Sequence, residues 1–127
     1  MIVRFFYSRS AKRSIKKTKH DLLASCETVK SVLALNPNFG VEIPKRSGLC
    51  KMRLSVQGLN CGKSGGYRLI YRAVIIDEVW HIVFLRVFFK EDIEDLSHDD
   101  YSVLENESEE ILSSTLDYEW QEFPASH

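Results

Sequence analysis

The stretch from Gly62 to Lys90, GKSGGYRLIYRAVIIDEVWHIVFLRVFFK, decides the fold. It opens with a glycine-rich loop, which is followed by a run dense in β-branched and aromatic residues. The charged pair Asp77-Glu78 separates this run from a second one. Two strand-like segments about a short polar turn predict a β-hairpin. Large apolar residues at nearly every position from Val79 to Phe89 predict a central strand that is covered on both faces.

A two-residue turn at Asp77-Glu78 fixes the register expected for this hairpin. The cross-strand pairs that follow are Ile76 with Val79, Arg68 with Val87, and Gly66 with Phe89. Arg68 and Phe89 would then share one face at the open end of the hairpin, next to the loop that carries Lys63. We therefore expect a cation, an aromatic ring and a basic glycine loop to meet there.

Towards the N-terminus the pattern predicts a strand and then two helices. Ile2 to Tyr7 is typical of a strand, and Ser8 or Ser10 is positioned to cap a following helix. Apolar residues recur at helical spacing from there to residue 35. A break at residues 18–21, with Asp21 as a second cap, divides this segment into a helical hairpin.

Between the helices and the hairpin, a proline- and glycine-containing turn at residues 36–40 ends the second helix. From Leu49 to Val56 apolar and polar residues alternate, so a half-buried strand should present Lys51 and Arg53 outward. After the hairpin, Ser97 and Asp100 resemble a capping box at the start of a weakly amphipathic, acidic helix.

Together these elements predict an α+β fold of order β-α-α-β-β-β. We expect a mainly antiparallel sheet, an N-terminal helical hairpin with the helices to one side of the sheet, and an acidic C-terminal helix and tail. The change in character after the hairpin predicts a body of residues 1–96 followed by an acidic segment of residues 97–127.

The length and composition of the chain limit the class of protein. A chain of 127 residues is long enough for one domain with a single hydrophobic core. No apolar run is long enough to cross a membrane, and the N-terminus is charged too early for a signal peptide. Three widely spaced cysteines predict neither a disulfide framework nor a zinc site. We therefore expect a cytoplasmic protein without a metal or other cofactor.

The net charge of −1 hides a strong segregation of charge. All 17 lysines and arginines lie between Arg4 and Lys90, where only five acids occur, so this part carries a charge of +12. The other 13 acids lie in residues 91–127, which contain no lysine or arginine. A basic body indicates a polyanionic partner such as nucleic acid. Mutual neutralisation of the two parts for solubility is an equally good explanation of the pattern.

Nucleophile, metal and nucleotide motifs are missing from the sequence. The loop at Gly62–Gly66 lacks Walker spacing and leads into a strand, so it is either a basic loop that approaches a phosphate backbone or a plain connector. The four histidines are scattered; His81 is expected in the core, and His98 is a candidate to approach a site. Any enzyme chemistry would depend on cations, namely Lys51, Arg53, Lys63, Arg68 and Lys90.

Three blocks of sequence carry a resemblance to a known family. They are Gly48–Leu54 (GLCKMRL), Gly62–Tyr71 (GKSGGYRLIY) and Phe88–Leu96 (FFKEDIEDL). In this order and at this separation they resemble the RelE/ParE superfamily of bacterial toxins, and most closely its HigB-like RelE-type branch. The turn at residues 36–40 also fits, and the resemblance covers most of residues 2–96.

The resemblance implies the toxin of a type II toxin–antitoxin system. Many such toxins enter the ribosome and cut mRNA with the RNA's own 2′-OH as nucleophile, and a cognate antitoxin neutralises them, often in a hetero-oligomer on operator DNA. This chemistry requires a base, cations at the phosphate and a proton donor for the leaving oxygen, but no metal.

Carried over by position, the resemblance assigns Lys51 as a base or phosphate ligand, and Arg53 and Arg68 as phosphate-stabilising residues. Lys63 would contact the RNA or ribosomal backbone, Phe89 would stack on a base, and Lys90 would add a cation after the last strand. For each residue the alternative is an ordinary place on a strand or in the core. Glu91 and Ser97 stand near positions where some relatives carry an arginine and a tyrosine, so the general acid is unassigned.

The sequence is therefore consistent with three functions. The first is a ribosome-dependent endoribonuclease that inhibits translation, and the second is a ParE-like toxin that acts on DNA gyrase without cutting RNA. The third is an inactive, binding-only relative in which residues 91–127 fold over the cationic face. The cation cluster favours the first of these.

Overall fold

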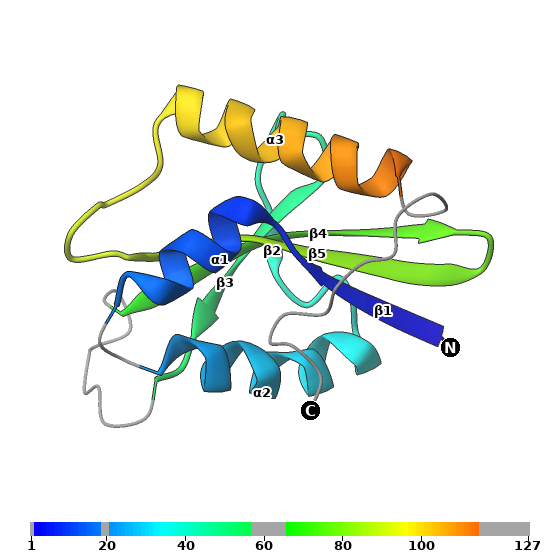
Figure 1. The fold of residues 1–127 in the computed structure, drawn as a ribbon, viewed down its shortest axis with the longest axis horizontal. Helices are drawn as coiled ribbons and strands as arrows, with labels where there is room; N and C mark the ends of the chain where they lie inside the picture. The colour runs from blue at the N-terminus through cyan, green and yellow to red at the C-terminus, as the bar shows by residue number, and fades with distance from the viewer. Residues whose placement is uncertain (1, 19–20, 57–65, 115–127) are drawn as a thin grey trace.

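In the part of the chain that the structure describes, the protein forms a five-stranded sheet and three helices (Figure 1). The computed structural model describes residues 2–18, 21–56 and 66–114. The strands are β1 (Ile2–Tyr7), β2 (Val41–Glu42), β3 (Leu49–Leu54), β4 (Tyr67–Ile76) and β5 (Val79–Phe89). The helices are α1 (Arg9–Lys16), α2 (Leu22–Leu35) and α3 (His98–Ser113). The glycine loop with Lys63, apart from Gly66, and the tail beyond residue 114 lie outside the described residues.

The strand order is β1-β5-β4-β3-β2, with β1 parallel to β5 and all other pairs antiparallel. The predicted α+β class and the mainly antiparallel sheet are confirmed. The short strand β2 was not predicted, because two exposed residues give no periodic signal. Strand β5 lies between β1 and β4, and its segment from His81 to Leu85 is buried, as the continuous apolar run predicted.

The hairpin of β4 and β5 has the predicted turn but a different register at its open end. Ile76 pairs with Val79, and Asp77 and Glu78 have φ values of 51° and 67°, the positive angles of a type I′ turn. A bulge then shifts the pairing, because Leu85 has no partner between the pairs Ile70–Arg86 and Tyr71–Phe84. The prediction for Arg68 was therefore wrong by one residue: Arg68 pairs with Phe88, and Tyr67 pairs with Phe89.

The two N-terminal helices begin at predicted caps. The hydroxyl of Ser8 accepts a hydrogen bond from the Ala11 N–H (3.1 Å) and donates one to the Leu85 carbonyl (3.0 Å), so it joins α1 to β5. The Asp21 carboxylate accepts from the Ala24 N–H (3.0 Å) at the start of α2. Both side chains satisfy N–H groups that a helix start leaves unpaired.

Helices cover both faces of the sheet, which corrects the expectation that they lie to one side (Figure 1). Residues of α1 and α2, such as Ile15 and Leu33, pack with Met52 and Tyr71 in one core cluster. Tyr101 and Leu104 of α3 pack in a second cluster on the opposite face. The weak amphipathic signal of α3 did not reveal which face of the sheet it would cover.

The third helix begins with the predicted capping box. The Ser97 hydroxyl accepts from the Asp100 N–H (3.1 Å), and the Asp100 carboxylate accepts from the Ser97 N–H (3.3 Å). Among the helices that the structure describes, none is long and apolar enough to span a bilayer.

Candidate functional site

Cations from three neighbouring strands lie on the face of the sheet that α3 covers. Arg53 on β3 pairs directly with Arg68 on β4, and Arg68 pairs in turn with Phe88 on β5. The adjacent row runs from Lys51 through Ile70 to Arg86. Side chains of directly paired residues share a face, as do residues two apart on a strand, so these two rows bring four cations together on this face.

Arg53 and Arg68 form the row at the open end of the hairpin. Arg53 is exposed, whereas Arg68 is only 8% exposed, and its guanidinium donates to the Tyr67 carbonyl (3.3 Å). Burial and the neighbouring charge of Arg53 lower the pKa of Arg68, although arginine stays charged in proteins. Two like charges directly opposite each other are unfavourable, and a bound anion would relieve their repulsion. This row is therefore suited to a phosphate.

Lys51 is held in place by a carboxylate. Its ammonium group lies 3.3 Å from Oδ1 of Asp95, which also accepts hydrogen bonds from the Tyr101 hydroxyl (2.6 Å) and the Leu96 N–H (2.8 Å). Burial raises the pKa of Asp95, but these two hydrogen bonds and Lys51 outweigh it, so the net pKa is lowered. The segment after β5 thus positions a cation of β3.

The acidic residues of α3 pair with the end of this face nearer the Asp77-Glu78 turn. Glu109 lies 2.5 Å from the Arg72 guanidinium, and Asp100 lies 3.5 Å from that of Arg86. Glu105 pairs at 3.1 Å with Arg46, whose other nitrogen lies 2.7 Å from Nδ1 of His98. The charge segregation of the sequence therefore corresponds to contacts between the helix and the sheet.

The other three predicted site residues have different outcomes. Phe89 lies on the opposite face, where its ring centroid is 4.7 Å from that of Tyr67, so the expectation that it shares a face with Arg68 was wrong. Lys90 is half-buried, and its backbone N–H donates to the Gly66 carbonyl (2.9 Å). Lys63 lies outside the described residues, and its predicted role is untested.

The described histidines and cysteines do not form a reactive cluster. His81 is 5% exposed, stacks on the Phe6 ring and lies 3.0 Å from the Val79 carbonyl through Nδ1, so it is a core residue as predicted. His98 contacts Arg46 rather than Lys51 or Arg68 in the contacts that the structure defines. No group of three metal-ligating side chains occurs within residues 2–18, 21–56 and 66–114.

Arg86, which was not predicted as a site residue, belongs to the same face as Lys51. A signal was available, because Arg86 is the only cation in the apolar run of β5. A charged residue inside an interior strand needs a partner or a function. The bulge at Leu85 places Arg86 on the α3 face, a displacement that alternation alone does not predict.

Comparison with known proteins identifies the fold. No family model and no curated protein matches the sequence. A solved structure of the E. coli toxin RelE, a double arginine-to-alanine mutant in the free state, matches with a TM-score of 0.55. The match covers 87% of this chain and 99% of RelE at 18% sequence identity. At this identity the likeness is one of fold, and this chain therefore has the fold of a RelE toxin.

Proposed function

We propose that this protein is the toxin of a type II toxin–antitoxin system and a ribosome-dependent endoribonuclease that cleaves translated mRNA. The observation that carries the proposal is the direct pairing of Arg53 with Arg68 on one face of the sheet, with Lys51 two residues along β3. The RelE-like fold supports the same conclusion. Cations from two strands that share a face can hold a single phosphate.

In the proposed reaction the RNA supplies its own nucleophile. The 2′-OH attacks the adjacent phosphorus, its proton passes to a base, and the bond to the 5′-oxygen breaks as that oxygen gains a proton. Arg53 and Arg68 stabilise the charge that develops on the phosphate oxygens. Lys51 is already paired with Asp95 as an ammonium ion, so we assign it to the phosphate rather than to the base. The mechanism requires no cofactor.

The proposal also specifies partners. A cognate antitoxin would neutralise the protein and would form a hetero-oligomer with it on operator DNA. The ribosome would present the mRNA to the protein in the cytoplasm. We place the protein in the HigB-like branch because of the three sequence blocks described above. We also propose that the residues that carry the activity all lie in residues 1–96, which hold every lysine and arginine of the chain, and that residues 97–127 form an acidic C-terminal segment. Lys63 and Lys90 would contact the RNA beside the central row.

Induction of the protein in a bacterial host tests the proposal. Growth should stop, and new 5′ ends should appear inside reading frames only while ribosomes translate. Blocking initiation on one reporter transcript, by removing its ribosome-binding site, should protect that transcript alone. Arrest with intact transcripts and broken DNA would instead indicate a gyrase-directed toxin.

A binding-only relative is the second candidate, because one observation favours it. The carboxylates of Asp95 and Asp100 pair with Lys51 and Arg86, so two cations of the face already have internal partners. The same induction experiment separates the two functions, since a binding-only protein would leave every transcript whole.

A further inference from the structure

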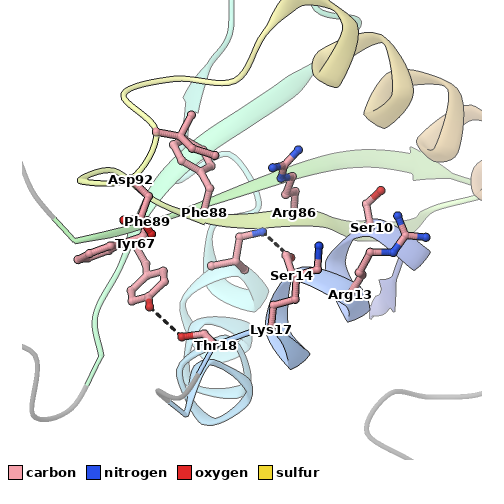
Figure 2. A pocket seen from close by; sticks show the side chains of 12 residues that line it. Ser10, Arg13, Ser14, Lys17, Thr18, Tyr67, Arg86, Phe88, Phe89 and Asp92 are labelled. Atoms are coloured by element: carbon pink, nitrogen blue, oxygen red, sulfur yellow. Dashed lines mark hydrogen bonds between the residues drawn. The ribbon is translucent and has the colours of Figure 1, made fainter.

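A groove of about 680 Å³ runs between α1 and the last part of β5 (Figure 2). Its walls combine cations, hydroxyl groups and aromatic rings. One side comes from α1 and the two residues beyond it, Lys17 and Thr18, and the other from β4, β5 and the segment that follows β5. The cations of the groove are Arg13, Lys17 and Arg86.

The groove forms where α1 replaces β1 as the neighbour of β5. Strand β1 pairs with β5 only as far as Phe84, and the edge of β5 beyond that point is covered by the helix. The Ser14 hydroxyl accepts a hydrogen bond from the Val87 N–H (3.0 Å), which fixes α1 along this edge. At the far end Thr18 and the Tyr67 hydroxyl are 2.8 Å apart. Both walls are therefore held in a fixed geometry.

The charge of the groove is positive. Arg13 and Lys17 are exposed, and the structure gives neither an ion pair with a described carboxylate. Arg86 pairs with Asp100 at 3.5 Å, and Asp92 is the one carboxylate in the lining. Two exposed cations, one on α1 and one directly after it, together with a third on the neighbouring strand, favour an anionic ligand.

The groove adjoins the candidate site. Phe88, which lines it, is the cross-strand partner of Arg68, and Arg86 lies in the row of Lys51. Phe89 lines it from the other face, where its ring packs against that of Tyr67. Phe88 and Tyr67 are buried, so the half-buried Phe89 is the ring in this lining on which a base can stack. A partly exposed aromatic ring beside cations is typical of surfaces that bind single-stranded nucleic acid.

We propose that this groove binds a phosphate-bearing nucleotide of single-stranded RNA next to the phosphate that Arg53 and Arg68 hold. The inference rests on the proposed function, which it extends with a second contact to the substrate. Cations and hydroxyl groups fit a sugar-phosphate chain better than a protein partner, whose contacts need an apolar centre. Of the large apolar side chains that the structure shows as exposed, Ile93 lines the groove at 37% exposure, whereas the more exposed Leu35, Phe39 and Val41 lie elsewhere.

A binding experiment with two matched double variants tests the groove. The first is Arg13→Gln with Lys17→Gln; the control is Arg9→Gln with Lys16→Gln, exposed residues of the same helix that do not line the groove. Both variants remove two positive charges from residues 9–17. The probe is a short fluorescent 2′-O-methyl RNA, which this chemistry cannot cleave, titrated by fluorescence anisotropy at several salt concentrations.

The groove variant should bind the probe roughly tenfold more weakly than the control variant, and its salt slope should fall by about 1.4, which is about 0.7 for each lost phosphate contact. Equal affinities and slopes for the two variants would overturn the inference. So would an equally strong, equally groove-dependent affinity for polyglutamate, which would indicate an acidic protein ligand. Because the probe is uncleavable, failure here is distinct from an absence of mRNA cleavage in cells.

Discussion

At the scale of single residues, the contact between Gly40 and Tyr71 shows how tightly β3 and β4 are joined to the turn after α2. The Tyr71 side chain is fully buried; its hydroxyl accepts from the Gly40 N–H (2.8 Å) and donates to the Pro37 carbonyl (3.1 Å). A Cβ at Gly40 would lie 2.8 Å from Cε1 and from the hydroxyl oxygen of this ring. The ring is enclosed by the core and has little room to move.

We therefore expect Gly40→Ala to lower the free energy of unfolding by about 1–3 kcal/mol, the usual cost of overpacking. Urea unfolding followed by circular dichroism measures the change. The control is Asn38→Ala, an exposed position in the same turn, for which we expect a change within about 0.5 kcal/mol. A Gly40→Ala protein as stable as the control would show that the turn can move away from Tyr71.

Because ionisable residues are buried in the core, we expect the free energy of unfolding to fall at alkaline pH. Burial, with the nearby charge of Glu27, raises the pKa of Cys26 from 9.0 to about 12, and burial raises that of Tyr71 from 10.0 to about 12. A group whose pKa is higher in the folded state stabilises the protein below its unfolded pKa. That contribution is lost as the pH rises towards the folded pKa.

The free energy of unfolding should thus begin to fall near pH 9 and continue to fall to about pH 12, by about 1.4 kcal/mol per pH unit for each proton involved. Urea unfolding at a series of pH values measures the slope. In Cys26→Ala the slope between pH 9 and 10 should become shallower, whatever the cost of the substitution itself. An unchanged slope in this variant would exclude Cys26 as its source.

Residue alternation predicted the face of some site residues and not of others. Lys51 and Arg53 point away from the buried Met52 because β3 is a regular strand, and the two-residue period fixes their face. Phe89 was placed on the wrong face because its prediction crossed the bulge at Leu85. A bulge inserts one residue without a glycine or proline to signal it, so the period fails beyond it.

At the scale of elements, the turn between β4 and β5 has the right length but unusual residues. Asp77 and Glu78 both have positive φ values. Residues other than glycine, asparagine and aspartate adopt such backbone angles only at a cost in free energy. We expect Glu78→Gly to raise the free energy of unfolding by about 0.5–1 kcal/mol, since glycine removes the steric cost but adds entropy to the unfolded chain.

Thermal and urea unfolding of Glu78→Gly measure this effect, and Glu78→Ala is the matched control. Alanine removes the same carboxylate but keeps the Cβ, so it should not stabilise the hairpin. If both variants changed stability equally, the charge of Glu78 rather than its backbone angle would be the cause.

Helix boundaries were largely predictable, whereas helix placement was not. Ser8, Asp21 and Ser97 each cap the helix that follows, because their side chains satisfy backbone N–H groups locally. The position of α3 depends on contacts far apart in sequence, such as Glu109 with Arg72. A local pattern contains no information about such pairs, and so the sequence did not reveal that α3 covers the cationic face.

At the scale of the whole molecule, α3 is part of the core as well as an acidic surface. Tyr101, Leu104 and Ile111 are each less than 8% exposed and complete the second core cluster. A chain ending at residue 97 would expose the face of the sheet that α3 covers, including Leu49 and Ile70. Neutralisation of cations is thus only one of the roles of this segment.

Two truncations test this role. A chain ending at Ser114 keeps all of α3 and should unfold cooperatively, with a midpoint close to that of the full chain. A chain ending at Ser97 should lose cooperative unfolding and bind the dye ANS, because it lacks three of the ten buried residues of one core cluster, Tyr101, Leu104 and Ile111. Cooperative unfolding of the shorter chain would show that residues 1–96 fold alone.

The central claim is that the paired Arg53 and Arg68 hold the phosphate that is cut. The most direct measurement is the mapping of 5′ ends in translated transcripts after induction of the wild-type protein, Arg68→Ala and Arg4→Ala. Arg4 is an exposed arginine on the edge strand β1, away from this row, so it is the matched control. Wild type and Arg4→Ala should produce the same in-frame ends, and Arg68→Ala should lose at least about 99% of them, since a single charge donor at the reacting atoms contributes about 100-fold or more. Undiminished cleavage by a folded Arg68→Ala protein would contradict the account.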